Sequence, residues 1–155
     1  MIFTTHDLGD GKRVRLRLTR PSDAPRVRAF LEDAPDVVVR HFTYYDPHRR
    51  LTLAAMAFVD GAEQIVGLAD VAFHGGGLAE IAVIVRDDAQ RQGLGTLLTE
   101  ALASMAVQRG ATRLKGEEPM LPLLGRLGRT VRTVEDGRAV AYTRLSRAPR
   151  RRRAA

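Results

Sequence analysis

The chain of 155 residues contains no cysteine, which excludes disulfides, thiol nucleophiles and zinc sites built on sulfur. No segment approaches the run of about 20 apolar residues that a membrane span needs, and 28% of the residues are charged. These two features exclude a transmembrane protein and a wholly disordered one. The first ten residues include acidic side chains and no apolar core, unlike a secretory signal. We therefore expect a soluble, cytoplasmic protein.

Hydrophobic residues make up 45% of the chain, enough for one ordinary domain that buries roughly 68 to 70% of its unfolded surface. The net charge is +7, but five arginines follow Ser146, so the first 146 residues carry only +2. We expect a globular domain over 1–146 and a basic tail over 147–155. Nearly all basic residues are arginine, which together with abundant alanine favours a coding bias over a nucleic-acid-binding surface.

The tail combines Pro149 with four successive arginines, and such a segment cannot form a core. Its default state is a disordered basic tip. The alternative is docking on the carboxylates of a second copy or of a partner protein. A nucleic acid is a less favoured partner, because the body offers no basic stripe that would extend the footprint.

Periodicity and turn residues predict a mixed α/β domain. The central runs 51–59 and 64–73 are joined by a short turn and so are antiparallel, which excludes a doubly wound sheet. The predicted order is a strand before Gly9, a strand at 13–19, a helix from Ser22 to about 33–35, a short helix and loop at 36–50, strands at 51–59, 64–73 and 78–85, a helix from Leu94 to Gly110, a strand at 112–115, a short helix at 119–127 and a hairpin of 131–134 with 138–145.

The most informative segment runs from Val83 to Thr96, where an apolar strand leads into a polar loop and two glycines open a helix. Gly93 and Gly95 allow close backbone approach, Arg91 adds positive charge, and the unpaired amides of the helix start favour an anion such as a pyrophosphate. A nucleotide P-loop does not fit, because it needs Lys after its second glycine. The dinucleotide fingerprint does not fit either, because Leu98 stands in place of its third glycine.

The sequence Gln90-Arg91-Gln92-Gly93-Leu94-Gly95 resembles the acyl-CoA loop of the GNAT superfamily of N-acetyltransferases. The stretches 10–17, 20–24, 65–67 and 79–83 are most similar to the acetyltransferase domain of bacterial protein lysine acetyltransferases. The resemblance covers nearly the whole chain except the tail. It implies a single-domain GNAT fold with a central, mostly antiparallel sheet and a splayed strand pair at the acyl-CoA site.

The resemblance also implies acetyl-CoA as cosubstrate, with the free main chain of Val83 and Val85 pairing with the pantetheine amides. Their side chains can equally be plain sheet core. The residues implied to hold the pyrophosphate are Gln90, Arg91, Gln92, Gly93, Leu94, Gly95 and Thr96. No metal site is expected, because the four histidines show no ligand spacing with Asp or Glu.

Transfer to an amine requires a base, because an ammonium with a pKa of about 10.4 is almost wholly charged at pH 7. Glu80 is the candidate, as a carboxylate on an otherwise apolar strand, and the resembling lysine acetyltransferases place a Glu base here. We expect it to be buried near the cofactor sulfur. The alternative is a strand-end carboxylate in water or paired with an arginine such as Arg86.

Other polar residues carry weaker signals. His41, Tyr44 and Tyr45 fall where the family places a loop lining the acceptor cleft, although each is also compatible with an ordinary surface loop. His74, beside three glycines, is predicted to be a solvated turn residue.

The chain departs from the family pattern at 115–124, which is shorter than expected and lacks both the usual Asn and the Tyr that protonates the departing thiolate. Gly128-Arg129 replaces the usual Gly-Phe, and Tyr142 is expected to pack. Two functions follow. The first is an N-acetyltransferase that moves an acetyl group from acetyl-CoA to a primary amine, with a protein lysine as one acceptor. The alternative is a weak or inactive acyl-CoA-binding sensor.

Overall fold

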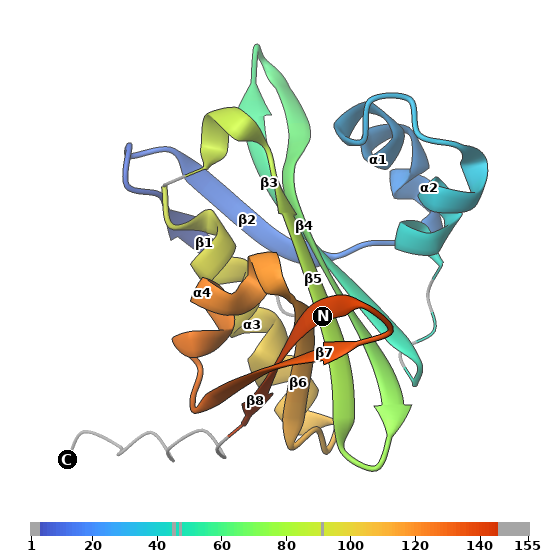
Figure 1. Cartoon of the computed structure of the whole chain (residues 1–155). Helices are drawn as coiled ribbons and strands as arrows, with labels where there is room; N and C mark the ends of the chain where they lie inside the picture. Colours follow the sequence, from blue (N-terminus) through green and yellow to red (C-terminus); the bar gives the residue numbers. More distant parts are fainter. Residues whose placement is uncertain (1–3, 45, 47, 91, 146–155) are drawn as a thin grey trace, which may run out of the picture.

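One mixed sheet organises the computed structural model, which describes residues 4–44, 46, 48–90 and 92–145. Its eight strands lie in the order β1-β2-β3-β4-β5-β6-β8-β7 (Figure 1), and every neighbouring pair is antiparallel except β5 with β6. The prediction of a mixed α/β domain with a mostly antiparallel sheet is therefore confirmed. The strands are β1 (Thr4–Asp7), β2 (Arg13–Leu18), β3 (Arg50–Val59), β4 (Ala62–Gly75), β5 (Leu78–Val85), β6 (Arg113–Glu117), β7 (Thr130–Glu135) and β8 (Arg138–Arg144).

Four α-helices and three short 3-10 helices connect these strands in the described residues. They are η1 (Pro21–Asp23), α1 (Ala24–Phe30), α2 (Asp36–Thr43), η2 (Asp87–Ala89), α3 (Leu94–Gln108), η3 (Glu118–Met120) and α4 (Leu121–Gly125). Helix α1 ends earlier than the predicted 33–35, because Glu32 and Asp33 take φ values of 52° and 61°, which a right-handed helix cannot accommodate.

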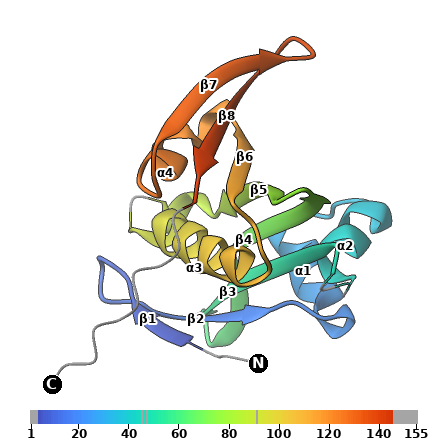
Figure 2. The same ribbon diagram turned by 90° about the horizontal axis from the view of Figure 1, so that it is seen from below.

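The alternation of side chains along β4 divides the core between the two faces of the sheet. Ala69 and Val71 face α3 and join the larger cluster, which also includes Leu98 of that helix. Leu68 faces the other way and packs with Val27 of α1 in the smaller cluster. As a result α3 covers one face, and α1 with α2 covers only part of the other (Figures 1 and 2).

The hairpin of β7 and β8 extends the sheet beyond β6 and projects away from the layer formed by β1 to β5 (Figure 2). This leaves the face opposite α3 open between α2 and the hairpin. No helix in the described ranges is both long and apolar enough to cross a membrane. Tyr45, Arg91 and the tail over 147–155 lie outside the described residues, so the proposed tail docking stays a prediction.

Candidate active site

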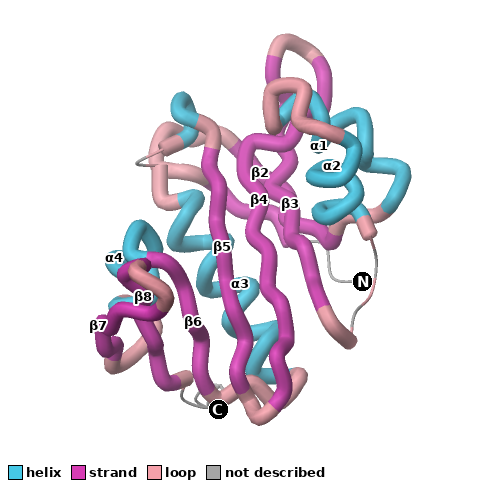
Figure 3. The backbone as a smooth tube through the Cα atoms, turned by 45° about the vertical axis from the view of Figure 1, so that its right-hand side comes forward, coloured by secondary structure: helices cyan, strands magenta, loops and turns pink. Residues whose placement is uncertain are grey.

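Strands β5 and β6 separate soon after they meet (Figure 3). Strand β5 pairs with β4 from Leu78 to Val85, but it pairs with β6 only from Leu78 to Glu80. Beyond Glu80 the outer main chain of β5 faces no strand within the described residues. Val83 and Val85 lie on this splayed segment, each partly exposed. The geometry matches the splayed pair that the resemblance implied.

A cleft of about 970 Å³ opens where the two strands part. Its first end, named here the loop end, is mostly apolar and is lined by Ala82, Val83, Val85, Gln90, Gly95, Pro119, Met120, Pro122 and Leu123. Its second end, named the acceptor end, is mostly polar and is lined by His41, Arg50, Asp70, Ala72, His74, Glu80 and Glu117. Ile81 also lines the cleft. A cleft lined by both an apolar and a charged set of residues suits a ligand whose reactive group lies between two chemically different parts.

The loop 90–96 begins with Gln90, whose Nε2 donates to the Val85 carbonyl at 3.3 Å and to Asp87 Oδ1 at 3.2 Å. Gly93 has a φ of 85°, a conformation that favours glycine, and open space lies where a Cβ would stand. No described side chain caps α3, so its first amides remain available to a ligand. The loop can therefore receive an anion at the helix start.

The remaining loop residues have different surroundings. The Leu94 side chain is buried in the main core, so only its main chain can contribute to binding. The carbonyl of Gln92 accepts from Gly9 N at 3.2 Å, which ties the loop to the β1–β2 turn. Thr96 Oγ1 accepts from Arg126 Nη1 at 3.1 Å. Arg126 places a cation beside the loop that sequence reasoning missed, because it follows α4 some 30 positions later in the chain.

At the acceptor end, Glu80 is 44% exposed, so the expectation that it is buried was wrong. The splay of β6 away from β5 leaves this carboxylate facing the cleft. His74 is not a purely solvated turn residue, because its Nε2 lies 3.3 Å from Glu80 Oε1. The register of β4 and β5 shifts between Phe73 and Gly75, and His74 is the extra residue of this irregularity. Such bulges re-aim a side chain, and here the side chain turns toward Glu80.

A second polar group in the acceptor end centres on Asp70, whose side chain is 10% exposed. Asp70 Oδ1 accepts from Thr52 Oγ1 at 2.8 Å, and Oδ2 lies 3.4 Å from Arg50 Nε and 3.5 Å from His41 Nε2. Arg50 Nη1 lies 2.7 Å from His41 Nδ1. Sequence reasoning missed Asp70 and Arg50. The available signal was a lone carboxylate within the apolar run 64–73.

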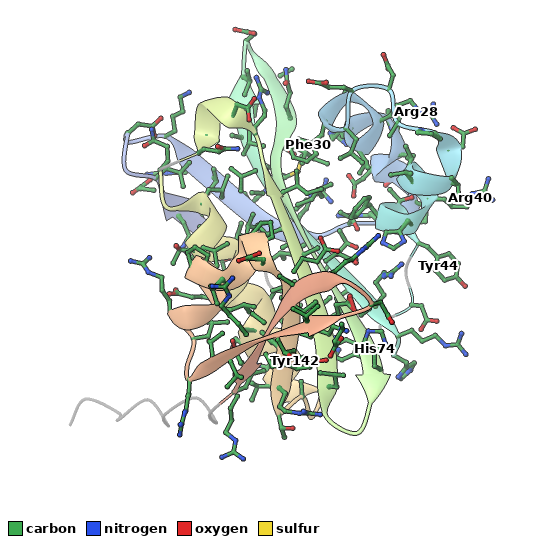
Figure 4. All side chains as sticks on the ribbon, in the orientation of Figure 1. Arg28, Phe30, Arg40, Tyr44, His74 and Tyr142 are labelled. Carbon is green, nitrogen blue, oxygen red and sulfur yellow. The ribbon has the colours of Figure 1, made fainter. Side chains whose placement is uncertain are left out.

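The three aromatic or imidazole residues predicted near the acceptor cleft have separate outcomes. His41 lines the cleft. Tyr44, at the end of α2, is 67% exposed and points away from the sheet (Figure 4). It lines a neighbouring surface pocket that shares His41 and Arg50 with the cleft. Tyr45 lies outside the described residues.

The tyrosine acid of the family has no replacement among the described cleft residues. Pro119, Met120 and Leu123 form that wall instead. Tyr142, labelled in Figure 4, is partly buried. Its hydroxyl donates to Glu135, and the Lys115 ammonium lies over its ring. The hydrogen bond to Glu135, aided by desolvation, raises the pKa of Tyr142, so it is held protonated away from the cleft.

No group of three potential ligands that could hold a metal ion occurs in the part of the chain that the structure describes. The groups available for chemistry in the cleft are thus carboxylates, imidazoles, a guanidinium and exposed main-chain amides. Such a set can bind an anion, accept a proton and orient an amine.

Comparison with known proteins identifies the family that shares this fold. The family model described as the acetyltransferase (GNAT) family matches residues 19–128. The GNAT domain of PAT from S. lividans is 25% identical, with a TM-score of 0.79, covering 92% of this chain and 97% of that one. A GCN5-related N-acetyltransferase from Kribbella flavida is 18% identical, with a TM-score of 0.66, covering 85% of this chain and 98% of that one.

A cAMP-binding acyltransferase from Mycobacterium smegmatis is 21% identical, with a TM-score of 0.67, covering 94% of this chain. The present chain spans 48% of that protein's length. No curated protein matches. The family match spans well over half of the residues, and together with the S. lividans domain it confirms the resemblance drawn from the loop and its flanking stretches. The chain belongs to the GNAT family of acetyltransferases.

Proposed function

We propose that this protein is an acetyl-CoA-dependent N-acetyltransferase whose acceptor is a primary amine, with a protein lysine as the favoured class. One observation carries the proposal. The loop 90–96 and the splayed strand β5 border the same cleft that holds Glu80 at its other end. A thioester held along this cleft would bring its carbonyl carbon between the loop end and the acceptor end.

The residues present fit acetyl-CoA. The amides at the start of α3 would hold the pyrophosphate, with Arg126 as a nearby cation. The free main chain of Val83 and Val85 would pair with the pantetheine amides, because β6 has already left β5 there. Bound acetyl-CoA supplies the acyl group and a thiolate leaving group.

At the acceptor end, Glu80 would remove the proton that a lysine ammonium carries at neutral pH. Arg50 pairs with Asp70 and Arg138 pairs with Glu117, whereas Glu80 has no guanidinium partner among the described residues, which favours a cationic amine over an anionic one at Glu80. The freed amine attacks the thioester carbon, the C–S bond breaks, and one of the two protons left on nitrogen goes to the thiolate while the other stays on the amide. Because a thiolate is a fair leaving group, the apolar wall at Pro119 and Met120 lowers the rate without preventing turnover.

The binding step is tested by calorimetry with acetyl-CoA on the wild type, Gly93→Val and Gly61→Val. Both glycines have a strongly positive φ and open space at the Cβ position, so both substitutions cost about 1 to 3 kcal/mol of backbone strain. Only Gly93 is at the cleft loop, while Gly61 is in the β3–β4 turn. We expect Gly93→Val to weaken binding about tenfold or more and Gly61→Val to leave it unchanged. Wild-type protein without any CoA affinity would contradict the proposal.

The reaction and its acceptor are tested by thiol release over a panel of amines, lysine peptides and candidate proteins. The alternative function is an acyl-CoA sensor with little or no turnover, which the apolar wall in place of the tyrosine acid favours. Glu80→Gln separates the two. In an enzyme it lowers turnover by about 10²-fold or more while acetyl-CoA affinity stays. In a sensor the wild type binds acetyl-CoA and releases no thiol with any acceptor.

A further inference from the structure

The geometry of the sheet places His74 at the acceptor end of the cleft. It is the extra residue in the irregularity between Phe73 and Gly75, and its Nε2 meets Glu80 Oε1 at 3.3 Å. The His74 and Glu80 side chains are 47% and 44% exposed, and both line the cleft. An imidazole with one nitrogen on a carboxylate and the rest of its ring reaching solvent can move a proton between the two.

The acceptor end holds another imidazole beside a carboxylate, His41 with Asp70, but that pair cannot accept a proton as easily. Arg50 Nη1 lies 2.7 Å from His41 Nδ1, and because a guanidinium only donates, this nitrogen must be the acceptor. The lone pair of His41 is therefore engaged, and a second positive charge on the ring would face Arg50 directly. Of the two pairs, only the imidazole of His74 has no guanidinium within hydrogen-bond distance among the described residues.

A carboxylate is in general a weaker proton acceptor than a neutral imidazole, so a histidine beside a carboxylate gives the proton a better resting place. The proton taken from each acceptor ammonium must also leave the cleft before the next turnover. His74 meets both needs, because it touches Glu80 and is open to water.

We propose that Glu80 and His74 act as one base, with His74 relaying the acceptor's proton to solvent. The inference rests on the proposed function. One proton passes from the ammonium to Glu80 and from Glu80 Oε1 to the unprotonated Nε2 of His74. The imidazolium then releases its Nδ1 proton to water, and the neutral ring exchanges tautomer through water. The second amine proton still goes to the thiolate, so each turnover releases one amide, one thiol and one proton.

The charged groups around this pair come from several strands. Lys115 of β6 is the backbone partner of Glu80, and Glu135 holds the Lys115 ammonium at 2.5 Å. His41, Arg50, Asp70 and Glu117 line the same cleft. Two groups in contact titrate as a unit, so the pH profile of the rate reports the Glu80–His74 pair within this field and neither residue alone.

The test is the pH profile of kcat/KM for the wild type, His74→Ala, His74→Gln and the control His48→Ala. His48 lies outside the cleft, at a separate surface pocket. We expect the wild-type kcat/KM to fall as the pH drops through about 6 to 7, the range of imidazole. His74→Ala and His74→Gln should lower kcat/KM at pH 7.5 by about tenfold or more, and their dependence between pH 5.5 and 7.5 should be lost.

Added imidazole should restore both the rate and the pH dependence of His74→Ala, and His48→Ala should match the wild type. Unchanged acetyl-CoA affinity shows that each variant is folded. His74→Ala should add little to the loss already caused by Glu80→Gln, because the two residues act as a unit. The relay is overturned if His74→Ala has a lowered kcat/KM but keeps the pH profile of the wild type and is not rescued by imidazole. It is also overturned if His74→Ala has the kcat/KM of the wild type. Failure of the proposed function is distinct, because the wild type then releases no thiol.

Discussion

Two carboxylates, Asp23 of η1 and Glu80 of β5, differ in how completely they are paired. Asp23, at the start of α1, accepts from Arg17 Nη1 at 2.7 Å, from Arg17 Nη2 at 2.6 Å and from the Arg20 amide at 2.9 Å. Arg17 and Asp23 are 6% and 2% exposed. Glu80 is half-exposed and meets His74 at a single, longer distance of 3.3 Å.

The two settings lead to different protonation behaviour. Burial by itself raises the pKa of Asp23, but the hydrogen bonds from Arg17 and Arg20 and the charge of Arg17 outweigh it and hold the pKa below its usual value. A carboxylate so saturated cannot take up a proton near neutral pH. Glu80 has open lone pairs in a cleft, so it is available to an incoming ammonium. Pairing therefore separates a structural carboxylate from one that can work on a substrate.

The largest expected effect is on stability at the saturated site. Asp23→Ala leaves the Arg17 guanidinium buried without its counter-ion, and breaking such a buried pair costs about 3 to 5 kcal/mol. Urea unfolding of wild type and variant measures this difference. Arg13→Ala is the matched control, because it removes only an exposed pair with Asp7. A loss below about 1 kcal/mol in Asp23→Ala would show that solvent or the more distant carboxylate of Glu63 compensates the Arg17 charge.

The same pair predicts a dependence of stability on pH. Because the folded pKa of Asp23 is lowered, its contribution is fully present above the unfolded pKa of about 3.9 and is lost as the pH falls through the folded value. We expect the urea midpoint of the wild type to drop below about pH 5. In Asp23→Asn, the part of the fall in urea midpoint that comes from protonation of Asp23 should disappear. Equal acid sensitivity in the two proteins would assign it to other carboxylates.

The loop end of the cleft could be predicted from sequence, whereas much of the acceptor end could not. The segment 90–96 is contiguous, and its glycines mark a strand-to-helix connection whose geometry is local. The contact of His74 with Glu80 instead depends on a one-residue irregularity in β4, which no local pattern reveals beside three glycines. The Asp70 group joins α2, β3 and β4, and Arg126 reaches Thr96 from beyond α4.

The hairpin pairings were predictable for a related reason. The hairpins of β3 with β4 and of β7 with β8 have short turns, so their pairing follows from neighbouring residues. The predicted end of α1 lay several residues beyond the observed one. The helix stops because Glu32 and Asp33 take a left-handed φ, and neither residue type marks a helix end in the sequence as strongly as glycine does. The exposure of Glu80 was also misjudged, because an apolar strand ordinarily has partners on both sides and β5 loses one of them after Glu80.

The smallest expected effect on stability belongs to the residue with the largest expected effect on turnover. Glu80→Gln removes one charge from a half-exposed side chain and keeps its volume, so the free energy of unfolding should change by less than about 0.5 kcal/mol. Urea unfolding at pH 7 measures this beside Asp23→Ala. Lys115 of β6 is the backbone partner of Glu80 on β5, so loss of the carboxylate can slightly destabilise the folded protein. The effect is small because Glu135 already binds the Lys115 ammonium. A loss near that of Asp23→Ala would instead identify Glu80 as a second structural carboxylate, and its assignment as the base would fall with it.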